Sequence, residues 1–144
     1  MKIANPANLI IIRNNKLLLA KRNEKECKFN NYWSIPGGGS NYDESIEETL
    51  HREIKEELGC KIKNYTYFKS YVFQLNTKLA VRAFYFYGDI IGKIKLNEEL
   101  SEFKWFEIND KEIFKNKIAF NQKQVIKDFI KFWKNKHKNL KIKY

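Results

Sequence analysis

Three consecutive glycines at positions 37–39 stand directly before a stretch with the pattern of a surface helix. In residues 43–58, apolar side chains recur four positions apart at Leu50, Ile54 and Leu58. That spacing is typical of a helix that packs one face on a core. Because glycine tolerates backbone angles and close approaches that side chains block, the triplet predicts a sharp connection into this helix.

The two ends of this helix carry boundary signals. Asp43 is the predicted N-cap, and Glu44 and Glu47 suit the positive N-terminal end of the helix. Gly59 fits the position just past the last turn. The helix is therefore expected to begin near residue 43 and to end at residue 58.

Short runs rich in branched and aromatic residues surround the helix. The predicted strands are residues 9–13, 16–21, 32–35, 62–72, 79–91 and 103–107. Asn14-Asn15 tolerates the positive φ angles of a tight turn between the first two. Strands and helices alternate irregularly, which predicts an α/β fold with helices packed on the faces of a mixed sheet.

A second helix is predicted near the C-terminus, at residues 121–136. Its apolar stripe includes Val125, Phe129 and Trp133, and lysines crowd its other face. A basic amphipathic helix can bind RNA or a membrane surface. We favour the alternative of a closing helix packed on the sheet, because the stripe is what an ordinary amphipathic helix needs.

Length and charge limit the functional classes. The 144 residues suit a single domain, residues 1–144, and the net charge is +11. Lysines outnumber arginines by 24 to 4, whereas surfaces that grip phosphates favour the arginine fork. Binding to nucleic acid stays possible but is not favoured, and the charge would attract an anionic substrate. Two cysteines outside any CxxC spacing and the absence of a long apolar run predict a cytoplasmic protein without membrane contact.

The predicted acidic helix gathers three carboxylates on one face. Glu53, Glu56 and Glu57 lie three and four residues apart, next to the apolar stripe. Such a cluster raises its own pKa values unless positive charge neutralises it, and Arg52 alone cannot balance three carboxylates. A divalent cation such as Mg²⁺ or Mn²⁺ would do so, with substrate phosphates completing its ligands. The alternative is a solvated helix face, which Lys55 is poorly placed to neutralise.

Residues 38–60, GGSNYDESIEETLHREIKEELGC, resemble the signature of the Nudix hydrolases, GX5EX7REUXEEXGU, in which U is a bulky apolar residue. All seven fixed positions match, and Cys60 takes the last U position, where an aliphatic residue is commoner. The resemblance extends to LLLAKR and YWSIPGGG before the signature and EELSEFKWFEI after it. It implies a Nudix-type α/β/α sandwich around a mixed sheet, and Mg²⁺-dependent hydrolysis of a nucleoside diphosphate linked to another group.

The resemblance also assigns roles within the signature. The implied metal ligands are Glu53, Glu56 and Glu57, together with a carbonyl of Gly37 or Gly38. Glu44 and Gly59 are implied to be structural, and Arg52 to orient the catalytic carboxylates. Metal-bound water has a lowered pKa, which favours its attack on phosphorus.

Other site residues lie outside the signature. The general base is expected to be Glu53 or an acidic residue of a later loop, where Glu99 is preferred over Glu98 and Glu102. The residues expected to contact substrate are Lys21, Arg22, Trp33 and Gly39. Trp33 has two open alternatives, stacking on a base or packing in the core.

The preferred function is hydrolysis of (d)NTPs to the monophosphate and pyrophosphate, by a monomer or homodimer acting on a small nucleotide. Pyrophosphate removal from RNA 5′ ends is the alternative, and a module that senses nucleotides without hydrolysis is a third. The proline expected downstream of the signature in ADP-ribose and CoA enzymes is missing, which disfavours those substrates.

Overall fold

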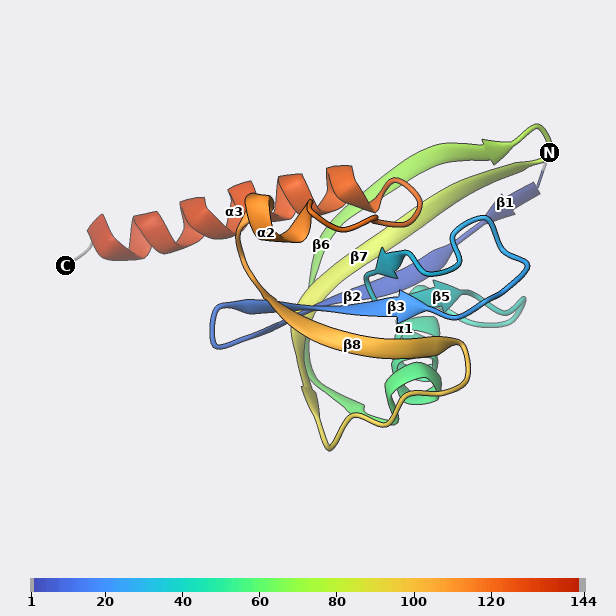
Figure 1. Cartoon of the computed structure of the whole chain (residues 1–144), viewed down its shortest axis with the longest axis horizontal. Coiled ribbons are helices and arrows are strands. Elements are labelled where there is room, and N and C mark those ends of the chain that lie inside the picture. Colours follow the sequence, from blue (N-terminus) through green and yellow to red (C-terminus); the bar gives the residue numbers. More distant parts are fainter. Residues whose placement is uncertain (1, 143–144) are drawn as a thin grey trace.

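The computed structural model describes residues 2–142, with side chains up to residue 138. Its strands are β1 (Lys2–Ala4), β2 (Pro6–Arg13), β3 (Lys16–Arg22), β4 (Trp33–Ser34), β5 (Gly37–Gly39), β6 (Lys61–Asn76), β7 (Leu79–Ile91) and β8 (Leu100–Glu107). Its helices are α1 (Ile46–Leu58), α2 (Asp110–Ile113) and α3 (Gln122–Ile142) (Figure 1). Each predicted strand and helix is present, and β1, β5 and α2 are additional elements.

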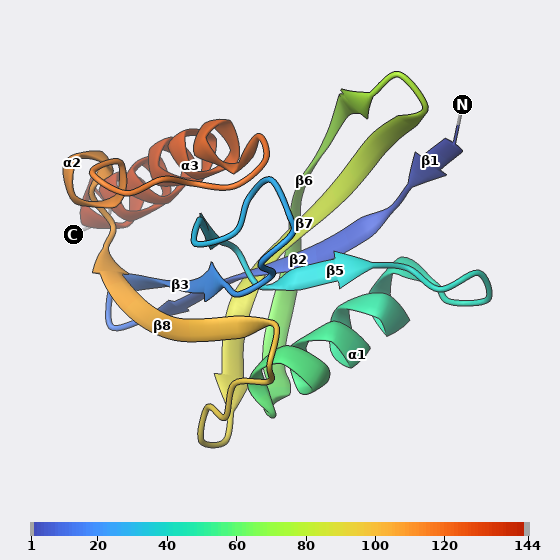
Figure 2. The same cartoon turned by 45° about the vertical axis from the view of Figure 1, so that its right-hand side comes forward.

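Strand β7 organises the mixed sheet. It pairs in parallel with β1 and β2 along one edge and antiparallel with β6 along the other. Strand β2 pairs antiparallel with both β3 and β5, and β3 pairs with β4 and β8. The β6–β7 hairpin is long, and its tip projects beyond the helices (Figure 2).

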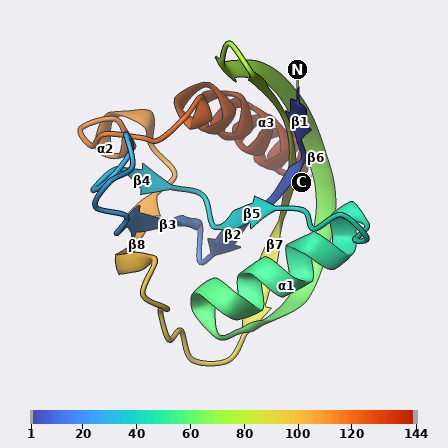
Figure 3. The same ribbon diagram turned by 90° about the vertical axis from the view of Figure 1, so that its right-hand side faces the viewer.

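Helices α1 and α3 cover opposite sides of the sheet (Figure 3). Side chains alternate between the two faces of a strand, so each central strand contributes residues to a hydrophobic core on each side of the sheet. Leu9, Ile11 and Leu18 pack in the cluster that contains α1, whereas Ile10 and Leu19 pack in the cluster that contains α3. Burying each of these side chains contributes roughly 1.5–3 kcal/mol. This arrangement confirms the α/β/α sandwich.

Helix α1 begins later than its sequence suggests. Its N-cap is Ser45, whose hydroxyl accepts a hydrogen bond from the N–H of Glu48, while the Glu48 carboxylate accepts from the N–H of Ser45. This reciprocal capping box replaces the expected Asp43 cap. At the other end Gly59 has a φ of 67°, and its N–H donates to the carbonyl of Lys55. The prediction for the C-terminus is confirmed.

Helix α3 packs on the sheet through its apolar stripe. Val125, Ile126, Phe129 and Ile130 are buried in the same core cluster as the β7 residue Tyr85. The apolar stripe of α3 is therefore buried against the sheet, which supports the packing role over a membrane-binding role. Within residues 2–142, no helix combines the length and the apolar character needed to cross a bilayer.

Candidate active site

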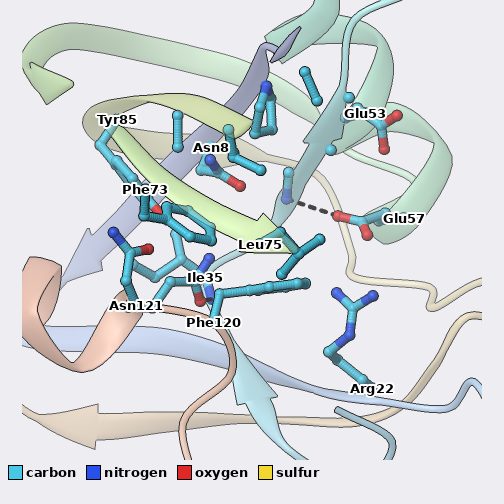
Figure 4. Close-up of a pocket in the computed structure, with 18 of the residues that line it drawn as sticks. Asn8, Arg22, Ile35, Glu53, Glu57, Phe73, Leu75, Tyr85, Phe120 and Asn121 are labelled. Carbon is cyan, nitrogen blue, oxygen red and sulfur yellow. Dashed lines mark hydrogen bonds between the residues drawn. The ribbon is translucent and has the colours of Figure 1, made fainter. Parts of the chain in front are cut away.

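One cavity of about 360 Å³ lies between the glycine strand β5, the start of α3 and the β6–β7 hairpin (Figure 4). Its charged end is lined by Glu53, Glu57, Glu99 and Arg22. Its other end is mainly apolar, and the residues there come from elements far apart in the sequence: Ile35, Phe73, Leu75, Val81, Tyr85 and Phe120. A cavity with one ionic and one apolar end suits a ligand of the same two-part character.

Glu57 is a buried carboxylate at the charged end of this cavity. Its side chain lies where α1 meets the core, and only 5% of the residue is exposed. The N–H of Gly37 donates to its Oε1 at 2.8 Å. Burial nevertheless raises the pKa of Glu57 to about 8, because this single hydrogen bond does not replace the lost hydration.

Glu53 lies one helical turn earlier, against the glycine strand. A Cβ atom built on Gly38 would lie 2.5 Å from the Glu53 carboxylate, so the missing side chain makes room for this group. Nη1 of Arg52 donates to Glu53 Oε1 at 2.8 Å. Burial raises the pKa of Glu53 despite this ion pair.

Glu56 departs from the predicted cluster. Its side chain is 55% exposed, is held by Arg52 Nη1 at 3.2 Å, and does not line the cavity. Glu53 and Glu56 are about 60° apart around the helix axis, and Nη1 of Arg52 donates to both carboxylates, but only Glu53 lines the cavity. Among the described residues, no three potential ligands already converge on one point.

A divalent cation nevertheless fits the charged end. Glu53 and Glu57 are carboxylates whose pKa values are raised by burial, so both would be stabilised by added positive charge. Oxygen ligands of this kind suit Mg²⁺ or Mn²⁺. Gly37 and Gly38 line the same cavity. The metal ligands remain a prediction.

Arg52 connects the loop before α1 to the carboxylates of the helix. Its Nε and Nη2 donate to the two oxygens of Glu44 at 2.6 and 2.9 Å, and Nη2 also donates to the carbonyl of Gly39 at 2.8 Å. The hydrogen bond from Arg52 lowers the pKa of Glu44 to about 2. These are the contacts that a structural Glu44 and an orienting Arg52 require.

Arg22 reaches the cavity, whereas Lys21 does not line it. Nη2 of Arg22 donates to Glu24 at 2.7 Å, and its guanidinium lies 4.9 Å from the centre of the Phe120 ring. Its buried Nε has no hydrogen-bond partner within the described part of the chain. Lys21 precedes Arg22 on β3, at a shift in the register of the β3–β8 pairing, and its Nζ lies 5.9 Å from the centre of the Trp33 ring.

Trp33 is a core residue. It is 7% exposed, lies edge-on to Phe106 with ring centroids 5.4 Å apart, and is absent from the cavity lining. Of the two alternatives for Trp33, the geometry favours packing over stacking on a base. Neither Trp33 nor Lys21 lines the cavity, so the contact of either residue with substrate stays a prediction that this geometry does not favour.

Glu99 is the residue of the acidic loop that faces the cavity. Glu98, its neighbour in the loop, and Glu102 of strand β8 do not line the cavity. The loop is tied to the end of β3, because the N–H of Asn23 donates to the carbonyl of Glu99 at 2.8 Å. This contact places Glu99 opposite the carboxylates of α1.

Several lining residues carry no local signal in the sequence. Gln122 begins α3, and its Oε1 accepts from the N–H of Ile35 at 2.8 Å. The Oδ1 of Asn121 is buried and unpartnered within residues 2–142. Asn8 is a polar residue in an otherwise apolar strand, and this break in the sequence pattern is a signal by which a cavity residue can be found. Phe120 has a φ of 56°, a constraint that the sequence does not reveal.

Comparison with known proteins identifies the family. Residues 4–129 match the NUDIX domain model. The chain therefore belongs to the Nudix family, and it is a Nudix pyrophosphohydrolase that acts on nucleoside diphosphate derivatives.

Individual relatives carry different names. The ADP-ribose pyrophosphatase of Methanocaldococcus jannaschii is 34% identical over 88% of this chain and 72% of its own length. The nucleoside triphosphatase NudI of Escherichia coli K12 is 31% identical over 65% of this chain and 74% of its own. The NAD-capped RNA hydrolase NudC of Mannheimia succiniciproducens is 32% identical, and the match covers 73% of this chain and 40% of that protein.

Solved structures show the same fold. The ORF135 protein of E. coli superposes with a TM-score of 0.77 at 24% identity, covering 90% of both chains. A MutT protein from Methanosarcina mazei gives 0.76 at 25% identity, covering 94% of this chain and 96% of its own. These similarities confirm the α/β/α architecture.

Proposed function

We propose that the protein hydrolyses nucleoside triphosphates, in ribo or deoxy form, to the monophosphate and pyrophosphate with Mg²⁺. The observation that carries this proposal is the two-ended cavity. The half-buried Glu53 and the buried Glu57 line the end suited to a metal and phosphates, and aromatic and apolar side chains line the end suited to a base. One nucleotide spans both ends.

We assign each step of this reaction to residues that line or border the cavity. Glu53 and Glu57, with Glu56 from the rim and a carbonyl of Gly37 or Gly38, would hold the cation. When bound, Mg²⁺ neutralises phosphate charge and lowers the pKa of a water molecule; Mn²⁺ can supply the same chemistry. Glu99 would accept the proton of the attacking water.

The phosphate chain would be oriented by the guanidinium of Arg22, which lines the charged end of the cavity. Water attacks the α-phosphorus, a new P–O bond forms, and the bond to the β-phosphate breaks. Pyrophosphate leaves, and the proton from water passes to Glu99. Arg52 would keep Glu53 aligned without touching the substrate.

Two other substrates have specific support. ADP-ribose is favoured by the 34% identity to a protein named ADP-ribose pyrophosphatase, although the downstream proline expected of such enzymes is missing. RNA 5′ ends are favoured by the net charge of +11. A module that senses nucleotides without hydrolysis is disfavoured, because all glutamates of the Nudix signature are present.

A substrate panel distinguishes these possibilities. Purified protein with Mg²⁺ is incubated with the eight common NTPs and dNTPs, ADP-ribose, Ap4A and 5′-triphosphate RNA, and products are separated by ion-exchange chromatography. We expect monophosphate and pyrophosphate in equal amounts from at least one NTP or dNTP. AMP with ribose 5-phosphate as the main products would replace this proposal by ADP-ribose hydrolysis. Nucleotide binding without any turnover would indicate the sensing module.

A further inference from the structure

Asn8 is a buried amide that the proposed chemistry does not use. It lies on β2 between Ala7 and Leu9, and the buried apolar run continues through Ile11. Only 5% of Asn8 is exposed, and it lines the cavity. Figure 4 shows no hydrogen bond from its side chain to any residue drawn around the cavity.

The Asn8 side chain lines the cavity and makes no hydrogen bond to the residues drawn there. A polar side chain placed among buried apolar residues costs free energy unless it finds hydrogen-bond partners. An apolar side chain at this position would continue the strand pattern and pack better. The amide is therefore better explained by a hydrogen bond that forms only when the cavity is filled.

The position of Asn8 indicates which part of a nucleotide it would meet. Asn8 is paired with Tyr85 of β7 on one side and with Gly37 of β5 on the other. The N–H of Gly37 donates to Glu57, and a Cβ built on Gly37 would lie 2.5 Å from Asn8 Oδ1. Adjacent strands are about 4.8 Å apart, so the Asn8 amide is close to the carboxylate end.

The apolar end of the cavity lies beyond Asn8. In the view of Figure 4, Asn8 stands between Glu57 on one side and Tyr85 and Phe73 on the other. In a nucleotide, the group between the phosphates and the base is the pentose. An amide both donates and accepts hydrogen bonds, and so does a sugar hydroxyl, so the two can pair well.

We propose that the Asn8 side chain binds a hydroxyl group of the pentose and selects nucleotides that carry it. The inference rests on the proposed nucleotide hydrolysis and adds the sugar-reading residue. An analogue without this hydroxyl leaves the buried amide unpaired, which is how such sites reject a smaller substrate. Base recognition is left to the apolar end of the cavity.

Binding of nucleoside monophosphates tests this independently of turnover. Isothermal titration calorimetry first finds the tightest binder among AMP, GMP, CMP and UMP. That nucleotide is then compared with its 2′-deoxy and 3′-deoxy analogues, using wild type, Asn8→Leu and the exposed control Asn135→Ala. In wild type and the control, one deoxy analogue should bind roughly five- to ten-fold more weakly, the range expected for one lost hydrogen bond.

The variant provides the decisive comparison. Asn8→Leu should weaken the binding of the parent nucleotide until its affinity equals that of the deoxy analogue. The affinity for the deoxy analogue itself should not change, as in a double-mutant cycle. Asn8→Leu should also melt at the same or a higher temperature, because an apolar side chain continues the buried apolar run of β2; a purely structural Asn8 would give a lower melting temperature. If Asn8→Leu does not fold, Asn8→Ala serves for the same comparison.

Three results would overturn the inference. The first is that wild type binds the parent nucleotide and both deoxy analogues with equal affinity. The second is that the Asn8 variant loses affinity by the same factor for all three nucleotides. Failure of wild type to bind any of the four monophosphates would also overturn it. If hydrolysis of triphosphates persists in any of these cases, the proposed function stands and only the role of Asn8 is lost.

Discussion

The N–H of Gly37 donates to Oε1 of Glu57 at 2.8 Å and so connects strand β5 to helix α1. Gly37 has a φ of 150°, and a Cβ there would lie 2.2 Å from the carbonyl oxygen of Ala7. The position therefore accepts glycine alone. Through this bond the glycine strand fixes a carboxylate that burial would otherwise leave without a partner.

The neighbouring glycines offer a matched test of packing around Glu53. Gly38→Ala should displace the Glu53 carboxylate, which lies 2.5 Å from the position of the new Cβ, and lower the rate of hydrolysis, with little change in melting temperature because only the end of a flexible side chain must move. Gly39→Ala should lower the rate much less, because nothing lies within 4 Å of its Cβ position. Initial rates of hydrolysis check both variants. Equal rates for the two variants would contradict the packing described for Glu53.

Replacing Arg52 should loosen the carboxylates of α1. Arg52→Ala removes contacts to Glu44, Glu53, Glu56 and the carbonyl of Gly39, so we expect a lower melting temperature and a loss of roughly ten-fold or more in kcat. Arg52→Lys should recover little, because lysine lacks the planar fork.

The control for Arg52 is a basic residue on the same helix. Lys55→Ala removes an exposed positive charge without these contacts and should retain both the kcat and the melting temperature. Similar losses in the Lys55 and Arg52 variants would indicate a general charge effect and contradict the orienting role.

Glu99 should be distinguishable from its neighbour in the same loop. If Glu99 accepts the proton of the attacking water, Glu99→Gln should lower kcat by about 10²–10⁴-fold with a small change in KM. Glu98→Gln should behave as wild type, since Glu98 does not line the cavity. Steady-state rates measure both. A Glu99 variant with wild-type kcat would move the role of general base to Glu53.

The raised pKa of Glu57 predicts an unusual pH dependence of stability in metal-free protein. The folded-state pKa of about 8 exceeds the ordinary value of 4.5, so the folded protein holds the proton more tightly. The proton on Glu57 makes its full contribution to the free energy of unfolding below about pH 4.5, and this contribution is lost as the pH rises to about 8. It amounts to about 1.4 kcal/mol for each unit by which the folded and unfolded pKa values differ. The free energy of unfolding should therefore fall over this window.

Urea denaturation at several pH values in EDTA measures this slope. Added Mg²⁺ should flatten it, because the ion stabilises the ionised carboxylate, and Glu57→Gln should flatten it without the metal. A slope that is the same in wild type and Glu57→Gln would show that another group carries it.

Elements whose pattern is local were predictable from the sequence. Helix α1 shows its period in Leu50, Ile54 and Leu58, and the same period puts Glu57 beside the apolar stripe, where the structure buries it. Gly59 marks the end of the helix through its own backbone preference. The prediction of Asp43 as the N-cap was wrong, because Ser45, three residues before Glu48, forms a reciprocal capping box with it.

Features that depend on distant partners were not predictable. The glycine triplet forms strand β5 only because Pro6, Ala7 and Asn8 of β2 lie beside it. Similarly, β6 extends past residue 72 because it pairs with β7 to Asn76. The apolar end of the cavity is built from three such distant segments, so its residues could not be read from any local pattern.

The central claim is that Glu57 is a metal-binding carboxylate required for hydrolysis and not for folding. The most direct test is the initial rate of pyrophosphate release from the best triphosphate substrate, measured against Mg²⁺ concentration for wild type, Glu57→Gln and Glu47→Gln. Glu47 is an exposed glutamate of the same helix. We predict that Glu57→Gln loses several orders of magnitude in rate at every Mg²⁺ concentration while its circular dichroism spectrum is unchanged, and that Glu47→Gln keeps the wild-type rate. A folded Glu57→Gln protein with near-wild-type rate and Mg²⁺ dependence would contradict the account.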